Sequence, residues 1–157
     1  MATEILRYLS GTLTQGSADA FVQLAMDTGI EPENGVGLKI ERIQFQGKDT
    51  DTAWQVAAAQ FMYLALSRDT KTAVPELTDT DCIWKKSLEL GMTTSGHKFF
   101  PRSFEEVAPD GLIIVEPIVY AQLDSTSFAQ ALDFDVRLYY SEVKLSEIEI
   151  LRLLNNV

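Results

Sequence analysis

The side chains best suited to catalysis occur singly in this chain. His97 is the only histidine and Cys82 is the only cysteine. A catalytic histidine needs a partner that positions it, and no local motif supports a nucleophilic pair of Cys82 with His97. We therefore predict an exposed loop histidine, a cysteine that packs as a small buried apolar residue, and no enzymatic activity. A single cysteine also excludes an internal disulfide and fits a reducing compartment.

Paired carboxylates are the next candidates, because several oxygen atoms at one point can bind calcium. Three pairs have Asp-x-Asp spacing, which on a strand places both carboxylates on one face: Asp49 with Asp51, Asp79 with Asp81, and Asp133 with Asp135. None lies in an EF-hand loop. We interpret them as solvated turns and a solvent-facing strand, so no metal is predicted; the alternative is a calcium ion that bridges two subunits. No cofactor is predicted either, because the glycines form no dinucleotide or phosphate loop.

Four of the basic residues come nearest to forming a cationic cluster along the chain: Lys85, Lys86, Lys98 and Arg102. The whole chain has a formal net charge of −10, from 13 basic and 23 acidic residues. That charge argues against strong direct contact with nucleic acid. We therefore expect these cations to pair with carboxylates, within the fold or between subunits.

Two adjacent phenylalanines, Phe99 and Phe100, precede Pro101 in a polar stretch. Two neighbouring aromatic side chains are difficult to bury together in a loop. One interpretation is a plug that covers an end of the fold. The other is an aromatic anchor for a neighbouring subunit, since aromatic residues contribute strongly to interface energies.

The stretch from Asp110 to Val157 determines the architecture in which these residues must fit. After the turn at Asp110-Gly111, the apolar run 112–123 predicts a strand buried through its middle, with an edge, bend or bulge at Pro117. Residues 124–127 predict a turn. The next strand alternates strictly, and four of its side chains face a core: Phe134, Val136, Leu138 and Tyr140.

A short helix is predicted from Ser146. Ser146-Glu147-Ile148-Glu149 matches the capping box, in which the serine hydroxyl accepts the amide N–H three residues on and Glu149 reaches back. At about nine residues the helix is too short to be stable alone, so it must dock on another surface. Its apolar residues are Ile150, Leu151, Leu153 and Leu154.

Four further strands are expected upstream, at residues 20–26, 38–45, 54–66 and 82–90. In the second, the apolar side changes after Ile40, so a bulge is predicted near Glu41-Arg42. The third also has some helical character, from its alanine triplet, but strand is preferred.

The remaining segments predict turns and loops. They are Ser10-Gly11, residues 68–81 and residues 91–109, the last with a helical turn at 103–107; residues 1–9 fit either a helical turn or an edge strand. About six strands with a helix only at the end predict an all-β, antiparallel sandwich or barrel. The length of 157 residues suits one domain, residues 1–157.

The C-terminal third, GLIIVEPIVYAQLDSTS and DFDVRLYYSEVKLSEIEILRLLNN, resembles the terminal strands of small viral coat proteins with a jelly-roll sandwich. The resemblance lies in a long strand after the Asp-Gly turn, a second alternating strand that ends in paired tyrosines, and a short closing segment. It implies a single jelly roll and a capsid subunit of a virion. Many such proteins that package RNA carry a basic arm, which this sequence lacks, so genome contact would need a small patch, another protein or counterions, or the subunit lies on the outside.

The first functional hypothesis is therefore a viral capsid or coat subunit that assembles with copies of itself, and possible partners include other virion proteins. Its predicted subunit interface comprises Phe99, Phe100, Arg102, Ile150, Leu153 and Leu154. Neither a signal peptide nor a membrane span is expected. The alternative is a monomeric acidic β-barrel or sandwich that binds a basic protein or carries a small apolar ligand.

Overall fold

The computed structural model describes residues 6–48, 60–90, 103–108, 111–128 and 130–155. Their elements follow the chain in this order: β1 (Arg7–Thr14), β2 (Val22–Asp27), the 3₁₀ turn η1 (Pro32–Asn34), β3 (Val36–Gly47), β4 (Gln60–Ser67), β5 (Cys82–Leu90), β6 (Ser103–Val107), β7 (Ile113–Ile114), β8 (Ile118–Thr126), β9 (Asp133–Lys144) and α1 (Glu147–Asn155).

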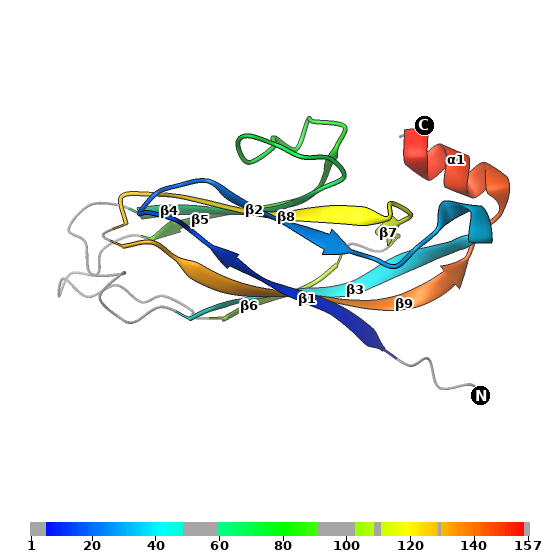
Figure 1. Ribbon diagram of the computed structural model, residues 1–157, viewed down its shortest axis with the longest axis horizontal. Coiled ribbons are helices and arrows are strands. Elements are labelled where there is room, and N and C mark those ends of the chain that lie inside the picture. The colour runs from blue at the N-terminus through cyan, green and yellow to red at the C-terminus, as the bar shows by residue number, and fades with distance from the viewer. Residues whose placement is uncertain (1–5, 49–59, 91–102, 109–110, 129, 156–157) are drawn as a thin grey trace.

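The strands form two antiparallel sheets that face each other as a sandwich (Figure 1). Sheet A has the order β1-β9-β3-β6, with β7 also paired to β3, and sheet B has the order β2-β8-β4-β5. Most neighbours within a sheet are distant in sequence, because the chain passes repeatedly from one sheet to the other. This strand order is that of a jelly roll. The prediction of an all-β, jelly-roll-like antiparallel sandwich with a short C-terminal helix is confirmed.

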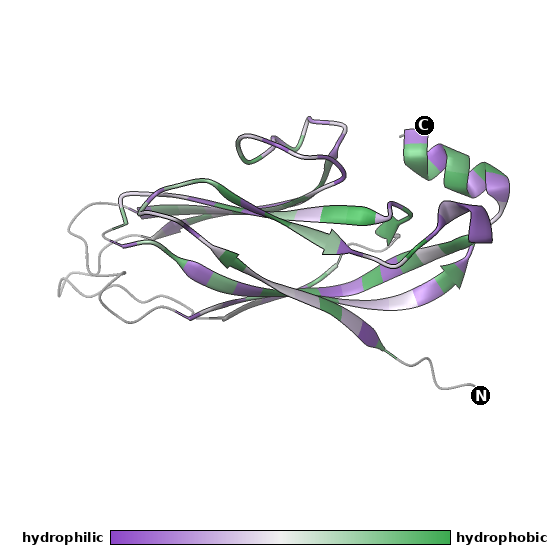
Figure 2. Cartoon of the chain, viewed as in Figure 1, coloured by the Kyte–Doolittle hydropathy of each residue, from purple (hydrophilic) through white to green (hydrophobic). Residues whose placement is uncertain are grey.

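The core lies between the sheets, and inward-facing side chains of both fill it. Figure 2 shows the corresponding banding, with apolar and polar residues alternating along the strands. Phe45 of sheet A and Trp84 of sheet B stack with ring centroids 5.7 Å apart. Between the described strands the two sheets therefore meet through packed apolar side chains. The largest fully buried side chains include Leu13, Ile40, Phe45, Met62, Leu64, Leu123 and Phe134.

Several local predictions are confirmed. The four core-facing residues of β9, Phe134 to Tyr140 in alternation, are all buried. The register of β3 against β9 shifts between Ile40 and Arg42, which is the predicted bulge. β2, β4 and β5 match the other expected strands, although residues 54–59 lie outside the described part of the chain. Arg7 to Leu9 belong to β1, an edge strand of sheet A.

Two predictions about strands were wrong. Ser103–Val107 is not a helical turn but the strand β6, because antiparallel pairing with β3 supplies the hydrogen-bond partners that the short segment lacks locally. The run 112–123 is two strands: β7 pairs with β3 in sheet A, and β8 lies in sheet B. The chain changes sheet near Pro117, a residue without an N–H for a sheet ladder. β8 is buried through its middle, as expected, with Ala121 to Leu123 inaccessible.

Two predicted turns were also misplaced. Residues 124–126 continue β8, and the left-handed residue that ends the strand is Ser127, with φ of 67°. Ser10-Gly11 lies inside β1, where Gly11 pairs with Val136. A Cβ at Gly11 would overlap the side chain of Leu24, so this glycine allows β1 and β2 to approach closely.

Candidate interaction surfaces

The C-terminal helix α1 is positioned by its cap. The Ser146 hydroxyl accepts the Glu149 N–H at 3.3 Å, and the Glu149 carboxylate accepts the Ser146 N–H at 2.7 Å, which is the predicted capping box. The Ser146 hydroxyl and the Ser146 N–H both donate to the Glu149 carboxylate, and these two hydrogen bonds lower the pKa of Glu149. Because the cap defines where the helix begins, it also defines which residues face the sandwich.

The helix has apolar residues on more than one side. Ile150 is 7% exposed and Leu153 is half-buried, so this side docks on the protein. Three further apolar residues face solvent: Ile148 is 64%, Leu151 is 51% and Leu154 is 41% exposed. A surface helix normally keeps its apolar residues toward the core. The solvent-facing set, Ile148, Leu151 and Leu154, is called the outer face of α1 below.

The far end of α1 is held by Arg68. Its guanidinium donates to the carbonyl oxygen of Leu153 at 2.8 Å and pairs with the carboxylate of Glu116. A cation near the last carbonyls of a helix is favoured by the helix dipole. Glu116 also accepts the N–H of Val115 at the point where the chain changes sheet. One mostly buried ion pair thus joins α1, sheet B and the crossover segment.

The basic group predicted from the sequence is partly described. Lys85 pairs with Glu76 at 3.0 Å, and Lys86 pairs with Glu106 at 3.2 Å, so the expected ion pairs within the fold are confirmed for these two lysines. Lys86 joins the edge strands of the two sheets, β5 and β6. Charged residues that point inward from edge strands discourage the addition of further strands. His97, Lys98, Phe99, Phe100 and Arg102 lie outside the described residues.

The outer face of sheet A is an open array of cationic and aromatic side chains. The guanidinium of Arg42 lies 4.3 Å from the Tyr139 ring centroid, and that of Arg137 lies 4.6 Å from the centroid of Tyr8. Arg137 also donates to the Tyr139 hydroxyl at 3.2 Å. Arg42 is paired with Glu105 at 2.6 Å. Cation–π contacts of this kind hold the guanidinium groups in fixed orientations.

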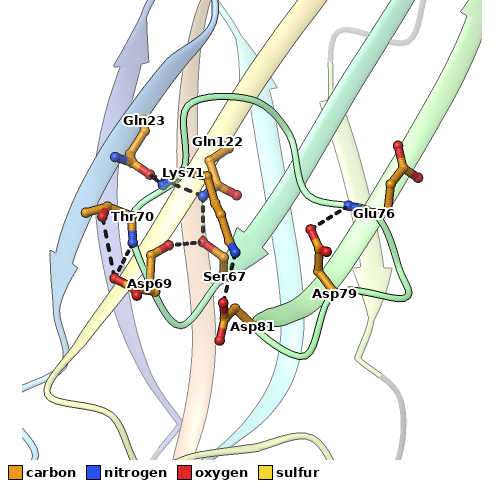
Figure 3. A network of polar contacts seen from close by, with 9 residues as sticks. All are labelled: Gln23, Ser67, Asp69, Thr70, Lys71, Glu76, Asp79, Asp81 and Gln122. Atoms are coloured by element: carbon orange, nitrogen blue, oxygen red, sulfur yellow. Dashed lines mark hydrogen bonds and ion pairs between the residues drawn. The ribbon is translucent and has the colours of Figure 1, made fainter.

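The outer face of sheet B is instead covered by the loop of residues 68–81, called the covering loop (Figures 1 and 3). The Lys71 N–H donates to Gln23 at 2.9 Å, and Gln122 donates to Gln23 at 3.3 Å and to Ser67 at 2.5 Å. Ser67 donates to the carbonyl of Asp69 at 2.7 Å. This chain of hydrogen bonds ties the loop to β2, β4 and β8. The amide oxygen of Gln122 is buried without a hydrogen-bond partner among the described atoms.

The paired aspartates serve local structure where they are described. The Asp79 carboxylate accepts the Glu76 N–H at 3.2 Å, and Asp81 pairs with Lys71 at 2.9 Å. Asp135 accepts a hydrogen bond from Thr12 and pairs with Lys48. The described residues contain no group of three or more histidine, cysteine or acidic side chains that could hold a metal ion. Asp49 and Asp51 lie outside them.

Cys82 begins β5 and is half-buried, so it is less enclosed than predicted. Burial raises the pKa of its thiol. A raised pKa lowers the thiolate fraction at neutral pH and with it the reactivity of the sulfur.

The chain shows weak structural similarity to proteins of known structure. No protein-family model matches the sequence, and no curated protein sequence matches it. Among solved structures, a chain of tomato aspermy virus has a TM-score of 0.48 and 9% identity, with 90% of this chain and 80% of that chain covered. A chain from the naturally occurring empty particles of cowpea mosaic virus has a TM-score of 0.38 and 10% identity, covering 93% and 89%. Both are structures of virus particles.

No helix in the described part of the chain has the length and apolar character needed to cross a bilayer. The surfaces that sequence reasoning missed are the two outer sheet faces. The alternation of β9 already placed Arg137 and Tyr139 outward. It could not identify Tyr8 and Arg42 as their neighbours, because those lie on strands more than 90 residues away in sequence.

Proposed function

We propose that this chain is a structural, non-enzymatic subunit of a viral capsid, which assembles with copies of itself and resides in the virion. The observation that carries the proposal is the outer face of α1. A short helix that docks one apolar side and presents a second to solvent offers a contact surface for another subunit. The jelly-roll strand order and the resemblance of the C-terminal strands to viral coat proteins support the choice of a capsid.

The proposed interface combines residues of α1 with Phe99, Phe100 and Arg102. Leu154 belongs to the outer face of α1, whereas Ile150 and Leu153 lie on the docked side and anchor the helix so that the outer face is presented. The edge strands β5 and β6 contribute less to the proposed interface, because the charged side chains of Lys86 and Glu106 discourage the pairing of another strand there.

The test compares the assembly of the native chain with that of a double variant, Ile148→Ser with Leu151→Ser. Both residues are exposed, so the fold should persist, while assemblies seen by light scattering after size exclusion and by electron microscopy should be lost. Arg152→Ala, an exposed polar change on the same helix, is the matched control and should assemble normally. A native chain that stays monomeric at high concentration, across salt and pH, would contradict the proposal.

A further inference from the structure

The outer face of sheet A contains a polar hollow that the proposed assembly through α1 does not use. Its volume is about 230 Å³, and it lies over β9 between β1 and β3. Ser10 and Thr12 border it on the β1 side, Gln44 and Gln46 on the β3 side. Asp135 and Arg137 of β9 lie along its floor.

Several groups in this hollow have hydrogen-bonding capacity to spare. Among the described residues, the side chains of Ser10 and Gln46 make no hydrogen bond, and Arg137 has no carboxylate within ion-pair distance. Asp135 uses one carboxylate oxygen, Oδ1, for both Thr12 and Lys48. Its other oxygen is thus available as an acceptor.

The donors are held in place before any ligand arrives. The Arg137 guanidinium lies over Tyr8 and donates to Tyr139, which in turn contacts the Gln44 amide oxygen at 3.3 Å. All of these residues stand on paired strands of a sheet. A site built on rigid elements loses little conformational entropy when it binds.

The balance of charge narrows the class of ligand. One carboxylate and one guanidinium border the hollow, and its other polar side chains are neutral amides and hydroxyls. Asp135 stays anionic beside Lys48 and would repel a phosphate or carboxylate ligand at its second oxygen, and a single carboxylate is a poor cage for a divalent cation. An apolar ligand would leave these polar groups without partners. An uncharged ligand rich in hydroxyl groups satisfies them all.

We propose that this hollow binds a neutral saccharide, one sugar ring in extent. Each hydroxyl of a sugar both donates and accepts, which matches the alternation of donor and acceptor side chains here. Planar amide, guanidinium and carboxylate groups contact neighbouring hydroxyls through two atoms at once. The exposed ring of Tyr8, against which the Arg137 guanidinium lies, supplies an apolar surface for the C–H face of an adjoining ring.

The experiment is an NMR titration of the ¹⁵N-labelled full chain with millimolar maltose, cellobiose and N-acetyllactosamine, in parallel with oligouridylate and a heparin tetrasaccharide. A neutral saccharide should shift the backbone amides of Ser10, Gln46 and Arg137. The amide of Ser87, which lies on the outer face of sheet B, should not move. Gln46→Ala and Arg137→Lys should each weaken binding about tenfold or more, the effect of losing hydrogen bonds to a charged or bidentate group.

Thr14→Ala is the matched control, because Thr14 is exposed on the same strand as Ser10 but outside the hollow. It should bind as the native chain does. Shifts caused only by the oligonucleotide or the heparin fragment would overturn the proposal in favour of an anion site. Absence of shifts with all three neutral sugars, or native affinity in Gln46→Ala, would also overturn it. A monomeric chain that binds sugar would uphold this inference while contradicting capsid assembly.

Discussion

The two outer faces of the sandwich carry the same kinds of residue in different surroundings. On sheet A, Gln46 is exposed and Gln44 half-buried. On sheet B, Gln122 and Ser67 are equally outward by strand alternation, yet both are inaccessible to solvent. The difference is the covering loop, which lies over sheet B (Figure 1). A side chain that points outward from a strand is therefore exposed to solvent only if no other segment covers that face of the sheet.

This difference determines how much each polar contact contributes to stability. Arg42–Glu105 on sheet A and Arg68–Glu116 at the start of the covering loop are both arginine–carboxylate pairs. The side chains of the first pair are 38% and 43% exposed, and those of the second are 18% and 11% exposed. Water screens the first pair and competes for its hydrogen bonds. In the second, loss of one partner leaves a charge that water barely reaches.

A substitution in the core between the two sheets should lower the stability more than the loss of either ion pair. We expect Trp84→Ala to lower the free energy of unfolding by about 3–5 kcal/mol, because it removes a buried aromatic ring and its stacking on Phe45. Urea denaturation followed by circular dichroism measures the change. An unchanged midpoint would mean that Trp84 does not join the two sheets.

The ion pairs test the comparison most directly. Arg68→Ala should cost about 3 kcal/mol, because Glu116 is left mostly buried without its cation and α1 loses the hydrogen bond to Leu153. Arg42→Ala is the matched change on the open face and should cost less than about 1 kcal/mol. Equal losses in the two variants, measured by urea denaturation, would show that exposure does not distinguish the faces.

The buried amide chain under the covering loop gives the next largest effect. Gln122→Leu keeps the size of the side chain but leaves Ser67 without its donor and Gln23 with the Lys71 N–H alone, at a cost of about 1–3 kcal/mol. The cost should lie toward the lower end, because the change also removes the unpaired Gln122 oxygen. Gln44→Leu on sheet A should change stability by less than about 0.5 kcal/mol. Faster hydrogen exchange at the Lys71 amide in Gln122→Leu alone would locate the effect in the loop.

Local patterns in the sequence were enough to predict many of the strands and the C-terminal helix. The alternation from Phe134 to Tyr140, the change of side at Glu41 and the capping box at Ser146 depend on neighbours along the chain, and each was confirmed. β6 has no such pattern in its five residues, and it is a strand because β3 lies beside it. Gly11 indicated a turn by its type, but pairing with β9 prevailed.

The candidate interaction surfaces could be predicted from the sequence even less, because they depend on tertiary structure. Nothing near Gln122 in the sequence indicates that residues 68–81 cover it, since the contact arises from the folding of one loop over a sheet. The hollow on sheet A likewise requires the register that brings Ser10 and Gln44 to either side of Arg137. The second apolar side of α1 could be inferred from its composition, but which side docks is settled by packing.

A fully exposed polar contact should show the smallest effect, and the cap of α1 provides one. The pKa of Glu149 is lowered from its ordinary value of 4.5 because the Ser146 hydroxyl and N–H donate to its carboxylate. A group with a lowered pKa in the folded state stabilises that state above its unfolded pKa, and the contribution is lost as the pH falls through the folded value. We therefore expect the end of α1 to loosen slightly below pH 4.5. In Ser146→Ala, NMR titration should find the Glu149 pKa raised toward its ordinary value and the acid dependence reduced. A Glu149 pKa that remains as low in the variant would mean that the cap is not the cause, whereas Ser141→Ala, distant from this carboxylate, should leave it unchanged.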